Sequence, residues 1–232
     1  MKKAELRRPF FVCNPKAYLY GKESLKLAKK CEELAVKYDF DVIFTAQHID
    51  LKTIVENCPH LIVCAQSMES LKPGRGMGHI LPEGLAEAGV KATFLNHAEN
   101  PMTVNELAMT IDRANELGLL TVVCSNEVAD TKAIASLHPD CMVCELNSLI
   151  GTGKSADISY MIQTNEIVKS VDPNIKVLQA AGISTGDDVY KAIKSGADAT
   201  GGTSGIVCAE DPYTKLEEMF EALDKARKDF CK

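Results

Sequence analysis

Several polar residues stand where short apolar runs of the sequence end. They are Asn14, Lys16, Gln66, His97 and Glu145. A carboxylate shielded from water removes a proton from a carbon next to a carbonyl group, and a neutral imidazole donates a hydrogen bond to the oxygen that becomes negative. An ammonium group adds a stabilising positive charge. A single histidine or glutamate at such a position is more often structural, so it is the combination of Lys16, His97 and Glu145 that predicts proton transfer beside a carbonyl group.

Two glycine-containing turns follow the last two apolar runs, at residues 181–184 and 201–205. Glycine permits close backbone approach and leaves amide groups free to point at an anion. Either turn alone can be explained as a tight connection. Together they favour a phosphate site, which makes a phosphorylated carbonyl compound the expected substrate.

Eight short apolar runs alternate with longer segments of helical periodicity, the pattern of parallel β-structure. The runs are residues 10–13, 41–45, 61–65, 92–96, 120–124, 142–145, 176–179 and 198–201. Such units form either a closed barrel or an open doubly wound sheet. The count of eight favours an α/β fold consisting of a single (β/α)8 TIM barrel over residues 1–232, in which the polar residues at the strand ends converge on one mouth.

Helix boundaries are marked by two dipeptides. Asn100 followed by Pro101 predicts a helix start, and Leu117 followed by Gly118 predicts its end. A helix beginning just beyond His97 would disfavour the protonated form of its imidazole, because the helix N-terminus carries a partial positive charge.

Composition limits the partners. The net charge of −6 with interleaved acids and bases gives no basic stripe, which argues against a nucleic acid partner. No run approaches the roughly 18 apolar residues of a membrane span, and the N-terminal apolar run is too short for a signal peptide. We therefore expect a cytoplasmic protein that binds no membrane.

The nine cysteines are an odd number, and several of them stand inside apolar runs, so they are interpreted as small buried hydrophobic residues in a reducing compartment. Cys141 and Cys144 have C-x-x-C spacing, but strand alternation predicts that they face opposite sides of the sheet. No cluster has ligand spacing, and the predicted chemistry requires neither a metal nor a cofactor.

From about Phe11 to Pro212, the order of these motifs resembles the triosephosphate isomerase family. Asn14-Pro15-Lys16 is similar to the family's Asn-x-Lys, which makes Lys16 the electrostatic lysine and Asn14 a substrate-binding neighbour. Residues 95–100, Leu-Asn-His-Ala-Glu-Asn, resemble the short archaeal-type version of the His-Ser-Glu motif. By this resemblance His97 is the electrophile and Glu99 a carboxylate that pairs with Lys16.

The most specific similarity lies in residues 145–154, Glu-Leu-Asn-Ser-Leu-Ile-Gly-Thr-Gly-Lys, which resemble the family's catalytic base and its closing loop. The resemblance makes Glu145 the base and the segment through Gly153 a lid. It also implies phosphate contacts from four residues, which are Gly151, Ser184, Gly201 and Gly202.

Two departures from the family pattern fall beside the expected catalytic residues. Leu146 stands where the family has proline after the glutamate, and Ala98 stands where it has serine after the histidine. The first change affects the hinge of the lid, and the second removes a hydrogen-bonding group near Glu145.

The resemblance implies interconversion of dihydroxyacetone phosphate and glyceraldehyde 3-phosphate by proton transfer through an enediolate. Two alternatives stay open. One is an isomerase of a related ketose phosphate such as erythrulose phosphate, and the other is a non-catalytic phosphate-binding barrel. Assembly as a homodimer or homotetramer is expected from the resemblance alone.

Overall fold

In the computed structural model, residues 3–180 and 182–231 are described, and together they form a closed barrel of eight parallel strands in sequential order. The strands are β1 (Phe10–Cys13), β2 (Val42–Ala46), β3 (Ile62–Ala65), β4 (Ala92–Leu95), β5 (Leu120–Ser125), β6 (Cys141–Cys144), β7 (Lys176–Gln179) and β8 (Ala199–Gly202). Phe10 of β1 pairs with Ala199 of β8, which closes the ring. The predicted TIM barrel is confirmed, and each predicted strand boundary lies within one residue of the observed one.

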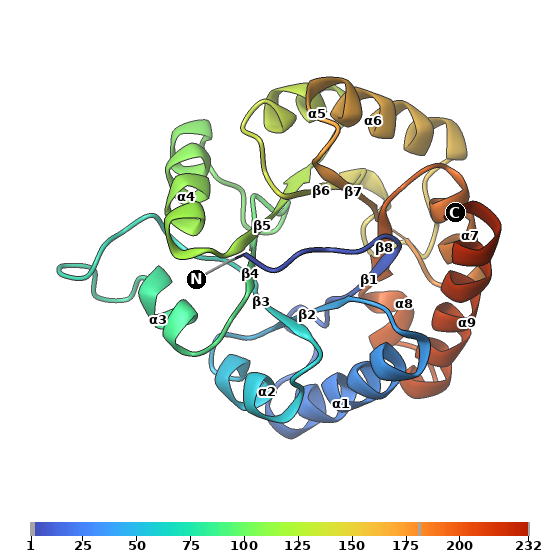
Figure 1. Cartoon of the computed structure of the whole chain (residues 1–232), viewed down its shortest axis with the longest axis horizontal. Coiled ribbons are helices and arrows are strands. Elements are labelled where there is room, and N and C mark those ends of the chain that lie inside the picture. Colours follow the sequence, from blue (N-terminus) through green and yellow to red (C-terminus); the bar gives the residue numbers. More distant parts are fainter. Residues whose placement is uncertain (1–2, 181, 232) are drawn as a thin grey trace.

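The helices form a ring outside the strands (Figure 1). They are α1 (Gly21–Tyr38), α2 (Leu51–Asn57), α3 (Pro82–Glu87), α4 (Val104–Leu117), α5 (Val128–Ala135), α6 (Ile158–Val171), α7 (Gly186–Lys194), α8 (Ser204–Val207) and α9 (Pro212–Phe230), with a short 3-10 helix, η1 (Asn147–Leu149). In α1 the buried residues include Leu27, Cys31 and Leu34, which share one face of the helix and pack on the strands.

Alternation along the strands divides the buried side chains into two layers. Phe10, Val12 and Ile43 belong to the cluster inside the barrel, whereas Phe11 and Val42 pack outward against the helices. The same alternation separates the two cysteines of β6, because Cys141 belongs to the inner cluster and Cys144 to the outer one. All nine cysteines lie in the described residues and are free thiols.

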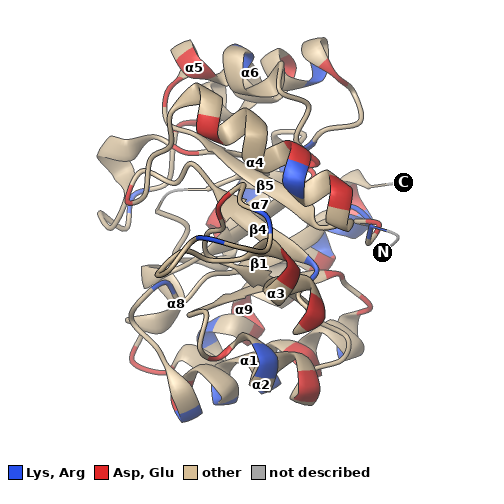
Figure 2. Ribbon diagram, turned by 90° about the vertical axis from the view of Figure 1, so that its left-hand side faces the viewer, with Lys and Arg blue, Asp and Glu red and all other residues tan. Residues whose placement is uncertain are grey.

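The two ends of the barrel differ. Ala4 and Leu6 pack against the inner cluster at the N-terminal ends of the strands, so the N-terminal segment helps to cover that end. Positive and negative side chains are interspersed over the helices (Figure 2). None of the helices in the described part of the chain is long and apolar enough to cross a membrane.

Candidate active site

A cavity opens at the carboxyl ends of the strands, where barrel enzymes have their active sites. Its walls come from the ends of five strands and the loops that follow them. The lining residues are Val12, Asn14, Lys16, Tyr18, Phe94, His97, Glu99, Val143, Glu145, Ile150, Gly151, Leu178, Ala180, Gly182, Ile183, Gly201, Gly202, Thr203 and Ser204. Eight of the nine predicted site residues are among them.

Lys16 reaches this cavity from the loop after β1, and Asn14 supports the loop. The Asn14 side-chain oxygen accepts a hydrogen bond from the Lys16 amide at 3.0 Å. The Lys16 ammonium group lies 2.7 Å from a carboxylate oxygen of Glu99, and 15% of its side chain is exposed. Partial burial by itself raises the pKa of Glu99, but the hydrogen bond and charge of Lys16 lower it below the ordinary value. The two residues therefore form a charged pair at the rim.

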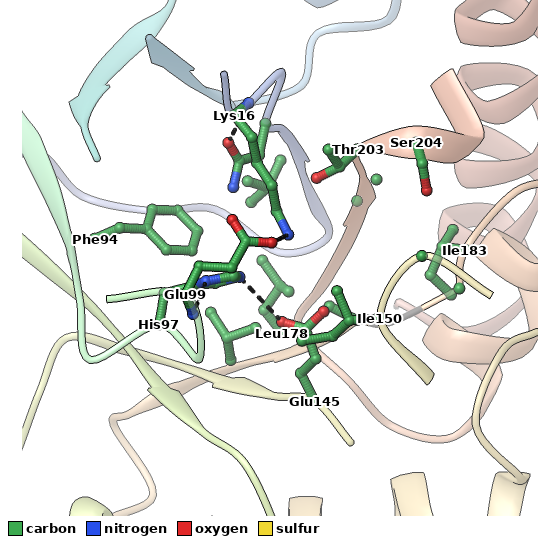
Figure 3. Close-up of a pocket in the computed structure, with 18 of the residues that line it drawn as sticks. Lys16, Phe94, His97, Glu99, Glu145, Ile150, Leu178, Ile183, Thr203 and Ser204 are labelled. Atoms are coloured by element: carbon green, nitrogen blue, oxygen red, sulfur yellow. Dashed lines mark hydrogen bonds and ion pairs between the residues drawn. The ribbon is translucent and has the colours of Figure 1, made fainter. Parts of the chain in front are cut away.

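His97 lies two residues beyond β4, and its hydrogen bonding defines its protonation. The backbone amide of Glu99 donates to Nδ1 of His97 at 3.1 Å, so Nδ1 carries no proton. Burial, and after it the positive charge of Lys16, lower the pKa of His97. The imidazole is therefore neutral at neutral pH, and its remaining proton sits on Nε2, the nitrogen nearest Glu145 (Figure 3).

The helix start predicted at Asn100 is wrong. Helix α4 begins at Val104, because Thr103 caps it and forms a reciprocal capping box with Glu106. Asn100 instead closes a tight turn, donating its amide to the carbonyl of His97 at 2.8 Å. The contact that fixes the neutral ring is therefore the Glu99 amide rather than a helix N-terminus beside His97. The predicted end at Gly118 is confirmed, with φ of 72°.

Glu145 follows β6 directly and faces His97 across the cavity (Figure 3). Its amide donates to the carbonyl of Ser125 in β5 at 3.1 Å, which fixes the backbone. Burial raises the pKa of Glu145, and the charge of Lys16 offsets only part of this effect. The carboxylate lies 3.8 Å from Nε2 of His97, which is longer than a hydrogen bond. Since the imidazole is neutral, the two groups are not an ion pair.

The predicted lid lies over one side of the cavity. Ile150 and Gly151 line the cavity itself. At the start of the lid, Leu146 and Leu149 pack against the apolar cluster of Tyr160 and Met161. Near its end, the lid lies against the loop after β7, where a Cβ added to Gly182 would be 1.9 Å from the carbonyl oxygen of Lys154. The structure therefore has the lid in contact with the rest of the mouth.

The glycine turn after β8 forms the other end of the cavity, through Gly201, Gly202, Thr203 and Ser204. Gly201 also has a packing reason to lack a side chain, because a Cβ there would lie 2.0 Å from the carbonyl oxygen of Val12. Thr203 and Ser204 were not predicted as site residues, although the sequence signal was present, since they directly follow the two glycines.

Ser184 is not among the described residues that line the cavity. Its amide donates to the carboxylate of Asp188 at 3.1 Å, and its hydroxyl lies 3.4 Å from the same carboxylate and 3.5 Å from the carbonyl of Gly153 in the lid. The structure therefore places Ser184 at the junction with the lid. Residue 181, which begins the same predicted turn, lies outside the described residues.

The arrangement suits acid-base chemistry on a small anion. A buried carboxylate and a neutral imidazole N–H face the same space, with an ammonium group beside them and backbone turns at the far end. Within residues 3–180 and 182–231, no group of three or more histidine, cysteine or acidic side chains is arranged to hold a metal ion.

Comparison with known proteins gives one consistent result. The family model described as "Triosephosphate isomerase" matches residues 9–218. The chain is 36% identical over 217 residues to the triosephosphate isomerase of Methanothermus fervidus, which covers 91% of this chain and 97% of the relative. It is 35% identical to the triosephosphate isomerase of Methanocaldococcus jannaschii, in an alignment that covers 90% of this chain and 98% of the relative. It is 34% identical to that of Methanopyrus kandleri, in an alignment that covers 94% of this chain and 100% of the relative.

Proposed function

The chain belongs to the triosephosphate isomerase family and catalyses the interconversion of dihydroxyacetone phosphate and glyceraldehyde 3-phosphate, and we propose that Glu145, His97 and Lys16 carry out the reaction. The observation that carries this proposal is the hydrogen bond from the Glu99 amide to Nδ1 of His97. It leaves a neutral donor, Nε2–H, facing the Glu145 carboxylate at 3.8 Å.

Glu145 acts as the base. Its carboxylate removes a proton from the carbon next to the substrate's carbonyl group, and the electron pair of the broken C–H bond forms the enediolate. The same carboxyl group then returns a proton to the neighbouring carbon. The hydroxyl proton passes from one substrate oxygen to the other through Nε2 of His97, so the isomerisation is complete without a net gain or loss of atoms. The raised pKa of Glu145 supports this role, because a stronger base is better matched to a weakly acidic C–H bond.

His97 stabilises the enediolate by hydrogen bonding. Nε2–H donates to the substrate oxygen as negative charge develops on it. When Nε2 gives up its proton to this oxygen, it takes the hydroxyl proton from the other substrate oxygen, so the imidazole ends the reaction neutral. A glutamate base and a neutral histidine that polarises the carbonyl group are the established catalytic pair of triosephosphate isomerases. In this chain the support for it is the contact to the Glu99 amide.

Lys16 and the glycine turns hold the anionic substrate. The ammonium group of Lys16, paired with Glu99 and supported by Asn14, attracts the phosphorylated substrate toward the reacting groups. The phosphate binds at the far end, which is lined by Gly201, Gly202 and the lid residue Gly151, because glycine turns leave backbone amides free to bind an anion. Ser184 contributes through its contact with the lid. Closure of the lid excludes water, which protects the enediolate from side reactions.

Substitution of the base tests this assignment. Glu145→Asp withdraws the carboxylate by one methylene group and leaves the phosphate end intact. We expect kcat to fall on the order of 100-fold or more, because a displacement of about 1 Å has that effect on proton transfer, while the affinity for 2-phosphoglycolate changes little. The assay is steady-state interconversion of the two triose phosphates. Unchanged turnover would remove Glu145 from the role of base.

Neither alternative from the sequence gains support. The relatives compared above are named triosephosphate isomerases rather than isomerases of a longer sugar. A barrel that only binds phosphate has no use for a buried base facing a neutral imidazole donor. Running an erythrulose phosphate beside the triose phosphates in the same assay tests the first alternative directly.

Assembly and location are part of the proposal. Large exposed apolar side chains recur in the segments after β1 to β4, including Tyr18, Tyr20, Ile49, Met77 and Val104. Such exposure on one half of the mouth supports a homodimer or homotetramer. The free cysteines support a reducing, cytoplasmic location. Light scattering of the purified protein tests the assembly, and a monomer at micromolar concentration would contradict it.

A further inference from the structure

Lys16 has an unusual backbone conformation for a residue with a side chain. Its φ is 47°, in the left-handed region that disfavours residues with a Cβ atom. The amide of the residue is held by Asn14, whose side-chain oxygen also accepts a hydrogen bond from the hydroxyl of Thr45 in β2. The amide contact alone leaves the other side of the residue, its carbonyl group, without a fixed position.

Two glutamine side chains hold that carbonyl group. Gln66, the first residue after β3, donates to the Lys16 carbonyl oxygen at 2.8 Å, and Gln47, the first residue after β2, donates to it at 3.2 Å. The Gln47 amide also donates to the side-chain oxygen of Gln66 at 2.8 Å. Rotating the Gln66 amide by half a turn would place its oxygen against the Lys16 carbonyl oxygen, so the three contacts fix one orientation.

The barrel brings these residues together. β2 pairs with both β1 and β3, so the residues that follow these three strands lie next to one another at the mouth. Neither glutamine is among the described residues that line the cavity of Glu145. Gln66 borders a neighbouring cavity with His97 and Glu99. The side-chain hydrogen bonds of both glutamines, however, are to the Lys16 carbonyl and to each other, so the direct link of these amides to the site is the loop that carries Lys16.

We infer that Gln47 and Gln66 are positioning residues for Lys16, holding the left-handed backbone that directs its ammonium group into the cavity beside Glu99. The inference rests on the proposed function, in which Lys16 binds the anionic substrate. Without the two donors, the Lys16 peptide is free to relax to negative φ. The Lys16 side chain then points in a different direction, and its ammonium group loses the 2.7 Å contact with Glu99.

Replacement by methionine removes the donors while keeping the size of the side chains. We expect Gln66→Met to lower kcat/KM about 10-fold, since it removes both the donor to the Lys16 carbonyl and the acceptor that orients Gln47. Gln47→Met, which loses the longer contact, has a smaller effect, and the double variant loses on the order of 10- to 100-fold. Gln163→Met on the exposed face of α6 is the matched control and should behave as wild type. Thermal unfolding of each variant reports whether the fold is kept.

A double-mutant cycle with Lys16→Met separates positioning from a structural role. The probe is 2-phosphoglycolate, whose dissociation constant remains measurable when turnover is very low. Lys16→Met and Gln66→Met should each weaken its binding. In the Lys16→Met background, however, adding Gln66→Met should change the dissociation constant by less than about twofold, because the group that it positions is already gone.

Three results would overturn the inference. Equal and additive losses in both backgrounds would mean that Gln66 acts on something other than Lys16. A fully active double glutamine variant beside an impaired Lys16→Met would show that Lys16 needs no such support, while leaving the proposed function standing. A fully active Lys16→Met would instead refute the proposed role of Lys16, and with it the premise of the inference.

Discussion

Replacing Gly182 with alanine tests whether catalysis requires the lid to lie against the loop after β7. Gly182 has φ of 66°, and a Cβ added to it would lie 1.9 Å from the carbonyl oxygen of Lys154 and 2.3 Å from its carbonyl carbon. Both are backbone atoms of the residue that directly follows the lid, so no rotation of a side chain can relieve the contact. Gly182→Ala therefore prevents the lid from adopting the position seen in this structure.

The size of the effect follows from these distances. Cβ contacts under 3.0 Å are essentially never found, so the lid backbone must retreat by roughly 1 Å, a displacement that can reduce turnover on the order of 100-fold. The backbone conformation adds a loss of stability, because a positive φ costs an alanine roughly 1–2 kcal/mol. We therefore expect a large loss of kcat/KM together with a modest loss in the free energy of unfolding.

Gly21→Ala is the matched control. Gly21 has φ of 57°, but nothing lies within 4 Å of a Cβ added there, and the residue does not line the described cavity. It carries the same conformational cost without a steric clash. Steady-state kinetics and urea unfolding of both variants should show equal losses of stability and a loss of activity in Gly182→Ala alone. A displacement of about 1 Å should change turnover far more than twofold. If the activity of Gly182→Ala is within about twofold of wild type, catalysis does not require the lid position seen in this structure.

Three further substitutions test the proposed catalytic residues and the hinge. Burial raises the pKa of Glu145, so its contribution to stability is present below the ordinary glutamate pKa and is lost as pH rises through the raised value. Glu145→Gln should therefore be inactive yet more resistant to urea than wild type at pH 7, with the difference shrinking toward about pH 4; lower resistance at pH 7 would contradict the burial argument. His97→Gln should lower kcat on the order of 100-fold and KM little, because the Nε2–H donor is lost, and a parallel loss of folding by circular dichroism would favour a structural histidine. Leu146→Pro should keep kcat within about threefold of wild type, since φ of −77° at Leu146 suits a proline ring. A much larger fall in kcat would show that the packing of Leu146 on the cluster of Tyr160 is required.

The strands were the most predictable part of the fold. The apolar runs are short and separated by longer segments of helical periodicity, and the observed strands lie within one residue of the predicted positions. The start of α4 was mispredicted because Asn100-Pro101 and Thr103 both have helix-start chemistry. Thr103 is the cap because Glu106 stands three residues later and completes the reciprocal hydrogen bonds, a signal that was present in the sequence.

The site was predictable in its components and less so in its details. Lys16, His97 and Glu145 could be found because polar residues at strand ends converge in a barrel, and the structure brings them to one cavity. Ser184 could not be placed, because whether its hydroxyl faces a ligand or Asp188 depends on the path of the loop. The absence of a side chain at Gly201 has a packing cause that only the neighbouring strand reveals.

The sequence by itself determined the number of repeating units, the end of the barrel at which the polar strand-end residues gather and the types of those residues, because alternation and spacing are local properties. The tertiary structure decided the protonation of His97, the lid contact at Gly182 and the support of Lys16 by Gln47 and Gln66. Most of these depend on contacts between residues about 30 to 50 positions apart along the chain. The His97 contact is only two residues long, but its geometry is set by a turn whose path the surrounding loops determine.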